Sequence, residues 1–392
     1  MPGTYVGVND TAKECYYAYV GVNNLAHRVK SGYYGIAGKA KKIFKHKKHY
    51  SNRIERKNDV TALSAGRYNL AATSIGDYGL FGGGYDGSSY YSTVDAYNTS
   101  LTRSTPTTLS VARRSPSATA VGDYVLFGGG SAYSSYGYGG AGSSNSSVVD
   151  AYNTSLTRST PTALSVARTT LAATSIGDYG LFGGGYGSYV RIDVDAYDTS
   201  LTRSKPTVLS MSRYYLAATS IGDYGLFGGG NSGSMSSVVD AYDTSLTRST
   251  PTALSVGRQQ LAATSIGDYG LFGGGYDNNP SYYSAVDAYD HSLTRSTPTA
   301  LSEARRYLTA TSIGDYGLFG GGNDDSSSYS VVDAYNTSLT HSTPTALSVA
   351  RSSLAATSIG DYGLFGGGAN GSSGYSIVDA YYVDKPRLKK LS

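Results

Sequence analysis

Tryptophan is absent from this sequence, cysteine occurs once, at Cys15, and glutamate occurs only three times. A single cysteine excludes an intrachain disulfide framework and any zinc site built from clustered cysteines. The shortage of glutamate, together with 51 glycines and 39 tyrosines, favours short strands and tight turns over long helices. Runs of 18 apolar residues are also missing, and the first residues lack the basic-then-apolar order of a secretory signal. We therefore expect an all-β fold, no membrane insertion and no signal-dependent secretion.

Charge is unevenly distributed along the 392 residues, although the net charge is only +4. Residues 1–58 hold twelve lysines and arginines against three acids, and residues 384–392 hold four against one, whereas the chain between them is acidic. The basic cluster at 39–57 is compatible with contact to nucleic acid or to an acidic partner, and equally with a solvated linker. We favour a linker over residues 46–58 and do not expect nucleic acid as a partner.

One repeated unit dominates the chain. The string Leu-Phe-Gly-Gly-Gly recurs seven times, with its first glycine at 82, 128, 183, 228, 273, 320 and 366. Most spacings are 45 to 47 residues, and the second is 55. A period of about 45 residues is typical of a four-stranded propeller blade. The repeat therefore predicts a β-propeller.

The unit that begins at Leu171 shows how four strands would follow one another. Residues 171–176 are small and apolar, as an innermost strand near a central axis needs, and Gly177-Asp178 is a hairpin signal. The second strand is expected over 179–182 and ends at the three glycines. A third strand over 193–197 follows a loop, and a fourth over 202–210 contains a proline suited to a sheet edge.

The two ends of the repeat region complement each other. Residues 59–67 match residues 160–168 of a full unit, although no unit precedes them, and the last unit stops after Tyr381. We predict that the strand at 59–67 completes the last blade, which closes the ring and covers both edges. Residues 59–383 would then form seven blades, followed by a basic tail at 384–392.

Glycines that close a strand, a tyrosine downstream and an arginine before the next inner strand together resemble the kelch family of β-propellers. The resemblance covers residues 59–383. Kelch repeats usually carry a tryptophan in the fourth strand, and here the corresponding site lies near Ser104. The resemblance implies a divergent kelch-like propeller in which smaller residues supply the packing between blades.

Variation among the seven units is confined to two segments. The loop after the three glycines has 7 to 9 residues in six units and 17 in the second, where it spans 131–147. We call these segments the variable loops. The second segment is the variable pair, the two residues after each unit's arginine: Tyr68-Asn69, Arg114-Ser115, Thr169-Thr170, Tyr214-Tyr215, Gln259-Gln260, Arg306-Tyr307 and Ser352-Ser353. Because antiparallel strands alternate in direction, both segments should lie on one end of the ring, the variable face.

Tyrosine is concentrated on this face, among serine, glycine and asparagine. Tyrosine offers a large contact area at a low entropy cost, as in antibody paratopes. Drift in loops would explain the variation but not the tyrosines, so we interpret the face as a recognition surface, and the loop at 131–147 is the foremost contact. The candidate ligand-binding residues are Tyr68, Tyr85, Tyr90, Tyr91, Tyr133, Tyr136, Tyr138, Tyr186, Tyr189, Tyr214, Tyr215, Tyr276, Tyr282, Tyr283, Tyr307, Tyr329 and Tyr375.

One arginine and one third-strand aspartate recur in every unit, and we predict that they pair within the ring instead of acting in catalysis. The arginines are Arg67, Arg113, Arg168, Arg213, Arg258, Arg305 and Arg351, and the aspartates are Asp95, Asp150, Asp195, Asp240, Asp287, Asp333 and Asp379. A second aspartate per unit, such as Asp178, follows a turn glycine. We interpret it as a turn residue instead of a calcium ligand.

Catalysis needs a unique constellation of residues, and these acids come as equivalent copies. His291 and His341 lie in turns of different units, so no set of histidine, acid and nucleophile assembles. Loop carboxylates at Asp86, Asp277, Asp324 and Asp325 leave a glycosidase conceivable, but they are scattered over the ring. We expect no enzyme, no cofactor and no metal site.

A shorter repeat opens the chain. Units of 14 residues begin at Tyr5, Tyr19 and Tyr34, and each has the pattern of a small hairpin. Three such hairpins bury little surface, so residues 1–45 are expected to dock or to oligomerise. The units resemble short repeats near the start of tail-associated proteins of phages and prophages of Gram-positive bacteria. That resemblance implies an attachment module that joins a virion or tail component.

These observations favour a phage or prophage tail-associated adhesin that presents its variable face to a glycan or protein on the host surface. It would reside in the virion, or in the bacterial cytoplasm before lysis. An intracellular kelch-type scaffold for protein interactions explains the propeller equally well but not the first 45 residues. A glycan-processing enzyme is the third alternative.

Overall fold

The computed structural model describes residues 53–134, 142–277 and 281–384, together with four strands between residues 19 and 45. Every regular element in these described parts is a β-strand. No helix among them is long and apolar enough to cross a membrane. The chain divides into two units: Ile54–Asp384, and Met1–Arg53 together with Lys385–Ser392.

The N-terminal unit contains two antiparallel hairpins. In the first, β1 (Tyr19–Val22) pairs with β2 (Leu25–Arg28), and in the second, β3 (Ser31–Ile36) pairs with β4 (Lys39–Lys45). The first hairpin begins at Tyr19, where a 14-residue unit is predicted to begin, whereas the second begins at Ser31, ahead of the predicted start at Tyr34. The unit expected from Tyr5 and the tail after Asp384 lie outside the described residues.

The larger unit consists of seven four-stranded antiparallel sheets, each built mostly from consecutive strands. Sheet one contains β6 (Ala71–Ile75), β7 (Tyr78–Gly82), β8 (Val94–Asn98) and β9 (Arg103–Ser104), and sheet two contains β11 (Ser117–Val121), β12 (Tyr124–Gly128), β15 (Val149–Asn153) and β16 (Arg158–Ser159). Sheet three contains β17 (Ala172–Ile176), β18 (Tyr179–Gly183), β19 (Val194–Asp198) and β20 (Arg203–Ser204). Sheet four contains β21 (Ala217–Ile221), β22 (Tyr224–Gly228), β23 (Val239–Asp243) and β24 (Arg248–Ser249). Sheet five contains β25 (Ala262–Ile266), β26 (Tyr269–Gly273), β27 (Val286–Tyr289) and β28 (Arg295–Ser296). Sheet six contains β29 (Thr309–Ile313), β30 (Tyr316–Gly320), β31 (Val332–Asn336) and β32 (His341–Ser342). Sheet seven contains β33 (Ala355–Ile359), β34 (Tyr362–Gly366), β35 (Val378–Asp384) and β5 (Arg53–Lys57).

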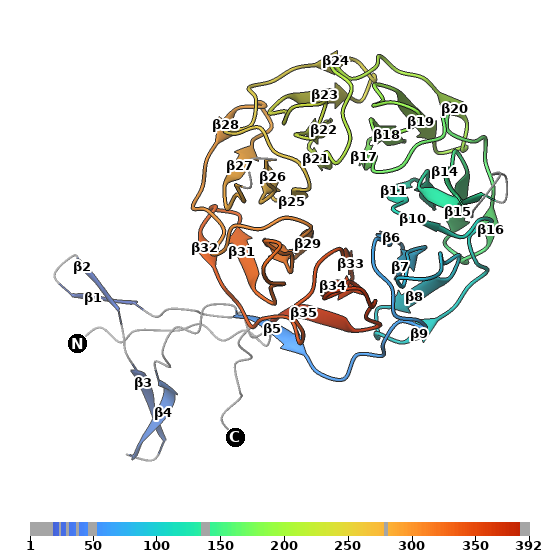
Figure 1. Ribbon diagram of the computed structural model, residues 1–392. Helices are drawn as coiled ribbons and strands as arrows, with labels where there is room; N and C mark the ends of the chain where they lie inside the picture. Colours follow the sequence, from blue (N-terminus) through green and yellow to red (C-terminus); the bar gives the residue numbers. More distant parts are fainter. Residues whose placement is uncertain are drawn as a thin grey trace. The chain divides into compact units, whose positions relative to one another are not determined.

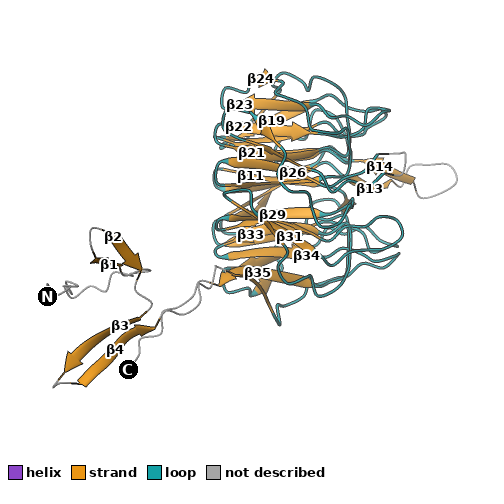
Figure 2. Ribbon diagram, turned by 90° about the vertical axis from the view of Figure 1, so that its left-hand side faces the viewer, coloured by secondary structure: helices purple, strands orange, loops and turns teal. Residues whose placement is uncertain are grey.

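The sheets stand around a common centre (Figure 1). Each first strand contacts the first strand of the next sheet, and β33 contacts β6, so the ring is closed. Small residues such as Ala172 and Ala173 allow these strands to approach one another. The fold is therefore all-β and propeller-like. A smaller sheet of β10 (Arg113–Arg114), β13 (Ser131–Ser134) and β14 (Gly142–Asn145) extends from one end of the ring (Figure 2).

The strand that closes the ring is β5, so the prediction of a closing strand at 59–67 is wrong. Residues 59–67 do match residues 160–168. In a full unit, however, the matching segment comes after the outer strand and is not part of it. The outer strand is only two residues long, as β16 shows just before residue 160. The fourth strand expected over 202–210 is likewise only Arg203–Ser204. In β5, Ile54 packs into the core beside Phe365 and Tyr381. Part of the predicted basic linker thus belongs to the ring.

Neighbouring sheets pack through a phenylalanine against a glycine. A Cβ atom on Gly183, at the end of β18, would lie 2.7 Å from Cε1 of Phe227 in the next sheet. Phe227 is fully buried and meets Tyr242 edge to face, with 5.9 Å between ring centroids. This Phe–Tyr packing recurs around the ring, so buried phenylalanine and tyrosine fill the space between sheets in a chain that has no tryptophan.

Candidate recognition face

The variable pair and the variable loop of each sheet bind each other through the backbone. Tyr68 and Tyr85 exchange two N–H to carbonyl hydrogen bonds of 2.8 and 2.9 Å, and Tyr214 and Asn231 do the same at 3.1 and 2.8 Å. In sheet two the equivalent contact joins β10 to β13. The two variable segments of every sheet therefore lie together, at the end of the ring where β13 and β14 project (Figure 2).

The second residue of every variable pair has a left-handed backbone, with φ between 50° and 56°. This conformation is rare for residues other than glycine, and it is strained most for a β-branched residue such as Thr170. Hydrogen bonds between sheets hold it: the N–H of Ser115 donates to the carbonyl of Asn69 at 2.7 Å, and that of Tyr215 to Thr170 at 3.0 Å. Equivalent bonds continue through Gln260, Tyr307 and Ser353 back to Asn69.

The second residues of the variable pairs form a hydrogen-bonded series around the ring. This series carries the side chains that vary most between units. The backbone is fixed by its neighbours, so the residue type can change without moving the chain. Comparing the seven units with one another found the variable positions but not this geometry, because residues as different as serine, glutamine and tyrosine do not signal a positive φ. The one signal that the backbone is the same in every unit was that the pair always follows the arginine directly.

A depression of about 600 Å³ lies over the series. Six of the seven sheets contribute to its wall, so it occupies the middle of the face. Four of the predicted tyrosines line it, namely Tyr68, Tyr186, Tyr215 and Tyr307. The other lining residues are Asn69, Arg114, Ser115, Ser131, Asn145, Thr169, Thr170, Asn323 and Ser353. The described lining thus consists of aromatic rings, hydroxyls, amides and the guanidinium of Arg114.

Tyr307 is the most constrained of these rings. The side-chain amide of Gln260 donates to its hydroxyl at 2.7 Å, and Tyr215 meets it edge to face with centroids 6.3 Å apart. Burial raises the pKa of Tyr307 above its usual value, with Tyr215 adding to the effect. A neutral, fixed hydroxyl therefore stands in the depression at physiological pH.

Further tyrosines form two clusters around arginines. Tyr85 meets Tyr90 edge to face at 5.3 Å between centroids, and Tyr90 meets Tyr133 at a tilt at 4.5 Å. Arg114 lies over Tyr85 and Tyr90. On sheets five and six, Tyr276 and Tyr282 stack at 6.0 Å and Arg306 lies over Tyr276.

Other predicted tyrosines lie apart from the two clusters. Tyr189 is 66% exposed and lies under Arg191. Tyr214 stands between Tyr186 and Tyr215. Tyr136 and Tyr138 lie outside the described residues.

Three predicted tyrosines instead brace their own loops. Tyr91 donates a hydrogen bond to Asp86 at 2.9 Å, Tyr283 donates to Asp277 at 2.7 Å and Tyr329 donates to Asp324 at 2.8 Å. Tyr375 has a backbone role, because its carbonyl accepts the N–H of Arg67. These four tyrosines shape the variable loops and are half-buried.

Two of the loop carboxylates, Asp86 and Asp324, have a lowered pKa. Backbone N–H groups of Ser89 and Ser88 lower the pKa of Asp86, and the Tyr329 hydroxyl is the largest of the effects that lower the pKa of Asp324. A glycosidase acid needs a raised pKa. Among the described residues, no three histidines, cysteines or acids are placed to hold a metal ion.

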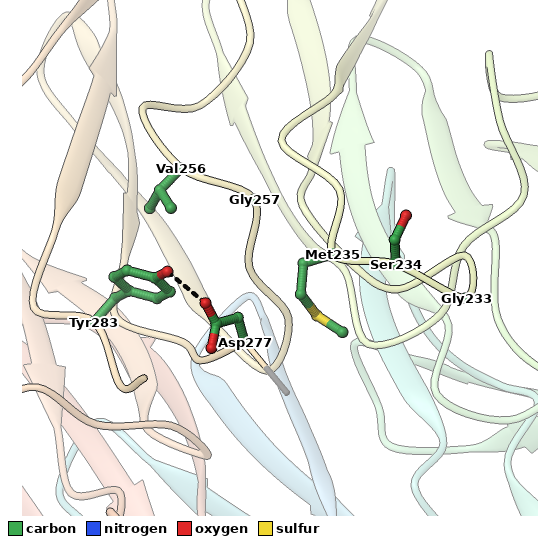
Figure 3. A pocket seen from close by; sticks show the side chains of 7 residues that line it. All are labelled: Gly233, Ser234, Met235, Val256, Gly257, Asp277 and Tyr283. Carbon is green, nitrogen blue, oxygen red and sulfur yellow. Dashed lines mark hydrogen bonds between the residues drawn. The ribbon is translucent and has the colours of Figure 1, made fainter. Parts of the chain in front are cut away.

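A second, shallower depression of about 500 Å³ lies between the loops of sheets four and five (Figure 3). Met235 and Val256 give it an apolar side, and the Asp277–Tyr283 pair forms the other.

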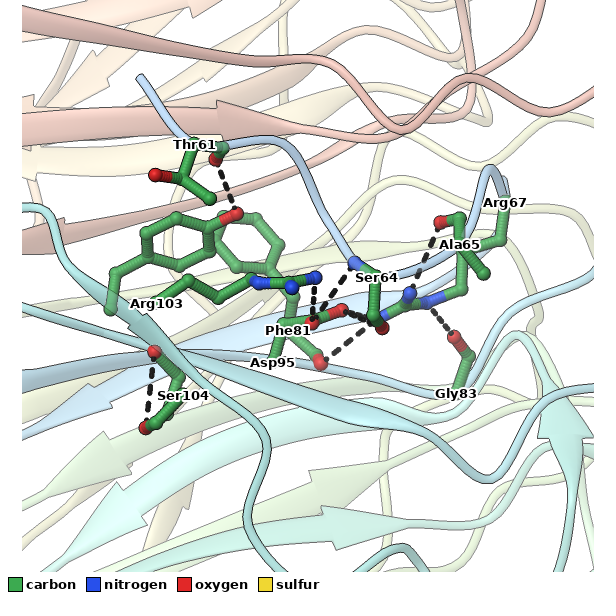
Figure 4. A network of polar contacts seen from close by, with 11 residues as sticks. Thr61, Ser64, Ala65, Arg67, Phe81, Gly83, Asp95, Arg103 and Ser104 are labelled. Atoms are coloured by element: carbon green, nitrogen blue, oxygen red, sulfur yellow. Dashed lines mark hydrogen bonds and ion pairs between the residues drawn. The ribbon is translucent and has the colours of Figure 1, made fainter.

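The predicted arginine–aspartate pairs are present in all seven sheets, and their side chains are almost fully buried. In sheet one, Arg67 binds Asp95 at 2.7 Å, and Arg103 of the outer strand binds the other carboxylate oxygen at 3.2 Å (Figure 4). Ser64 donates to the same carboxylate through its N–H and its hydroxyl, both at 3.1 Å. The pairs hold the ring together and do not line the depression.

Comparison with known proteins identifies only the fold. No protein-family model matches the chain, and no curated protein matches it. Among solved structures, that of YjhT is similar, with a TM-score of 0.59 at 11% sequence identity; the match covers 73% of this chain and 99% of that one. At such low identity the likeness extends to the fold alone.

Proposed function

We propose that the chain is a seven-bladed, kelch-like β-propeller that acts as a non-enzymatic receptor-binding protein. Its variable face would bind a glycan or protein on a bacterial surface, and residues 1–45 would attach it to a phage or prophage tail. One observation carries the proposal: all length variation among the units falls in the variable loops, and 15 of the 39 tyrosines lie in the described parts of the variable loops and variable pairs.

Rigidity and composition both support recognition. The variable pairs are fixed by hydrogen bonds between sheets, so little order has to be gained when a ligand binds. Tyrosine rings with serine and asparagine nearby provide stacking and adaptable hydrogen bonds. Asp86 and Asp324 are engaged by their own loops, which favours binding over glycoside hydrolysis.

Binding of the fluorescently labelled full chain to a glycan array and to intact Gram-positive cells tests the proposal. The test variant carries Tyr186→Ser and Tyr189→Ser, because these rings are 43% and 66% exposed. The control is Val208→Ser, which removes an equally exposed apolar group, 42% exposed, from the segment after β20.

We expect the double variant to bind at least about tenfold more weakly and the control to bind as wild type does. Wild-type protein that binds neither cells nor glycans would contradict the adhesin function and favour a protein-interaction scaffold. A double variant that binds as well as wild type would remove these tyrosines from the site.

A further inference from the structure

Among the described residues that line the central depression, Arg114 is the only charged one, and none is a carboxylate. The ionised carboxylate of Asp86 acts on Tyr68 but is not part of this lining. Its oxygens accept the N–H groups of Ser88 and Ser89, both at 2.7 Å, and the hydroxyl of Tyr91. The described lining itself therefore carries a net positive charge, which favours an anion.

Arg114 differs from the other arginines of the face because no ion pair within the described residues includes it. Its guanidinium carbon lies 5.3 Å from the centroid of Tyr85 and 5.4 Å from that of Tyr90. Arg306 occupies the same position of the variable pair in sheet six, but it is paired with Asp325. The two arginines form a natural comparison, one with a free charge and one neutralised.

The Arg114 guanidinium lies over two tyrosine rings, and within the described residues none of its N–H groups donates a hydrogen bond. A guanidinium has five N–H groups in a planar fork. The edge of the fork remains able to bind the two oxygens of a carboxylate or phosphate. Tyr68 and Tyr186 offer rings for stacking, and Asn69 and Asn145 offer amides for hydroxyl groups.

We propose that the central depression binds an anionic saccharide, with Arg114 holding its carboxylate or phosphate group. The inference rests on the proposed recognition function and names its ligand class. A volume of about 600 Å³ suits one or two sugar rings. A saccharide fits better than an acidic peptide because the described lining consists of rings, hydroxyls, amides and one guanidinium, with no leucine, isoleucine, valine or methionine among them.

Four probes of similar length identify the ligand chemistry when titrated into the full chain. Hexagalacturonate carries carboxylates, pentamannose phosphate carries a phosphate, maltohexaose is neutral, and hexaglutamate is an acidic peptide. We expect one of the two anionic saccharides to bind at least about tenfold more tightly than maltohexaose and hexaglutamate. Added salt should weaken that binding.

Three variants test the role of Arg114. Arg114→Gln should weaken binding of the preferred anionic saccharide by about tenfold and remove its salt dependence. Arg114→Lys keeps the charge but loses the planar fork of N–H groups, so its affinity should lie between those of wild type and Arg114→Gln. Lys205→Gln is the control: it removes an exposed cation that does not line the depression, so binding should stay within about twofold of wild type. Thermal unfolding of each variant checks that the face is intact.

Each outcome separates the inference from the proposed function. Wild-type protein that binds cells but does not prefer an anionic saccharide overturns the inference and leaves the adhesin function standing. Tighter binding of hexaglutamate overturns the saccharide class, and equal losses in Arg114→Gln and Lys205→Gln overturn the role of Arg114. Binding to neither cells nor any probe overturns both proposals.

Discussion

Asp195 and the tyrosine two residues after it, Tyr197, show how single residues tie the ring together. The carboxylate binds Arg168 at 2.8 Å and Arg203 at 3.3 Å, and it accepts two hydrogen bonds of 3.1 Å from Ser165. Tyr197 is fully buried and donates its hydroxyl to a backbone carbonyl. Buried charges are stable only when paired and hydrogen-bonded, so this arrangement must form as a whole.

Each sheet has one fully buried tyrosine on its third strand, and together these residues predict a sharp loss of stability at alkaline pH. The seven are Tyr97, Tyr152, Tyr197, Tyr242, Tyr289, Tyr335 and Tyr381. Burial is the largest cause that raises their pKa above the ordinary value, and the adjacent aspartate adds to it. Below pH about 10, the unfolded value, their contribution to stability is complete. Above it the unfolded chain loses protons that the folded chain keeps, so stability falls by about 1.4 kcal/mol per tyrosine per pH unit.

Ultraviolet titration of tyrosinate, followed together with circular dichroism, measures this effect. We expect the exposed tyrosines to ionise first and the seven buried ones to ionise only as the sheets unfold. Tyr197→Phe should remove one tyrosine from that late, cooperative step. Ionisation of all 39 tyrosines while the circular dichroism stays native would contradict the burial.

At the scale of elements, β5 is the strand that closes the ring from the other end of the sequence. Ile54 is 8% exposed and packs in the core of the last sheet. Arg56 binds Asp379 at 3.0 Å, in the place that Arg103 takes beside Asp95. The closing strand thus supplies both the apolar and the ionic contact that an outer strand makes elsewhere.

Ile54→Ala should lower the free energy of unfolding by about 2 to 4 kcal/mol, because it leaves a cavity between β5 and the last sheet. Lys57→Ala, on the same strand but exposed, should change it by less than about 1 kcal/mol. Denaturant titration of the full chain compares the two. Equal, small effects would show that β5 does not hold the ring closed.

In the unit that begins at Leu171, the sequence predicted the first three strands to within one residue, because alternating apolar residues and turn glycines mark them directly. It also predicted the Arg168–Asp195 type of pair, because one residue of each kind recurs per unit. It misplaced the outer strand, since Arg203–Ser204 has no apolar pattern and pairs over two residues only. It also missed the left-handed series at Ser115 and Thr170, which depends on hydrogen bonds between sheets.

At the scale of the whole molecule, one end of the ring varies and the other is constant. The turns at Gly177-Asp178 and its equivalents repeat nearly unchanged, whereas the variable face combines a fixed backbone with changing side chains. Among the 17 predicted tyrosines, only some line the depression or stack beside it, and others such as Tyr91 and Tyr283 brace the loops. Recognition is therefore expected from a subset centred on Tyr68, Tyr186 and Arg114.

The most direct test of the account is amide hydrogen exchange of the full chain with and without cell-wall fragments from a strain that it binds. The account predicts slower exchange in the variable pairs and variable loops, above all around residues 68–69, 114–115 and 186–189, and no change in the turns at the opposite end. Protection confined to those opposite turns, or to residues 19–45, would contradict the claim that the variable face binds the ligand.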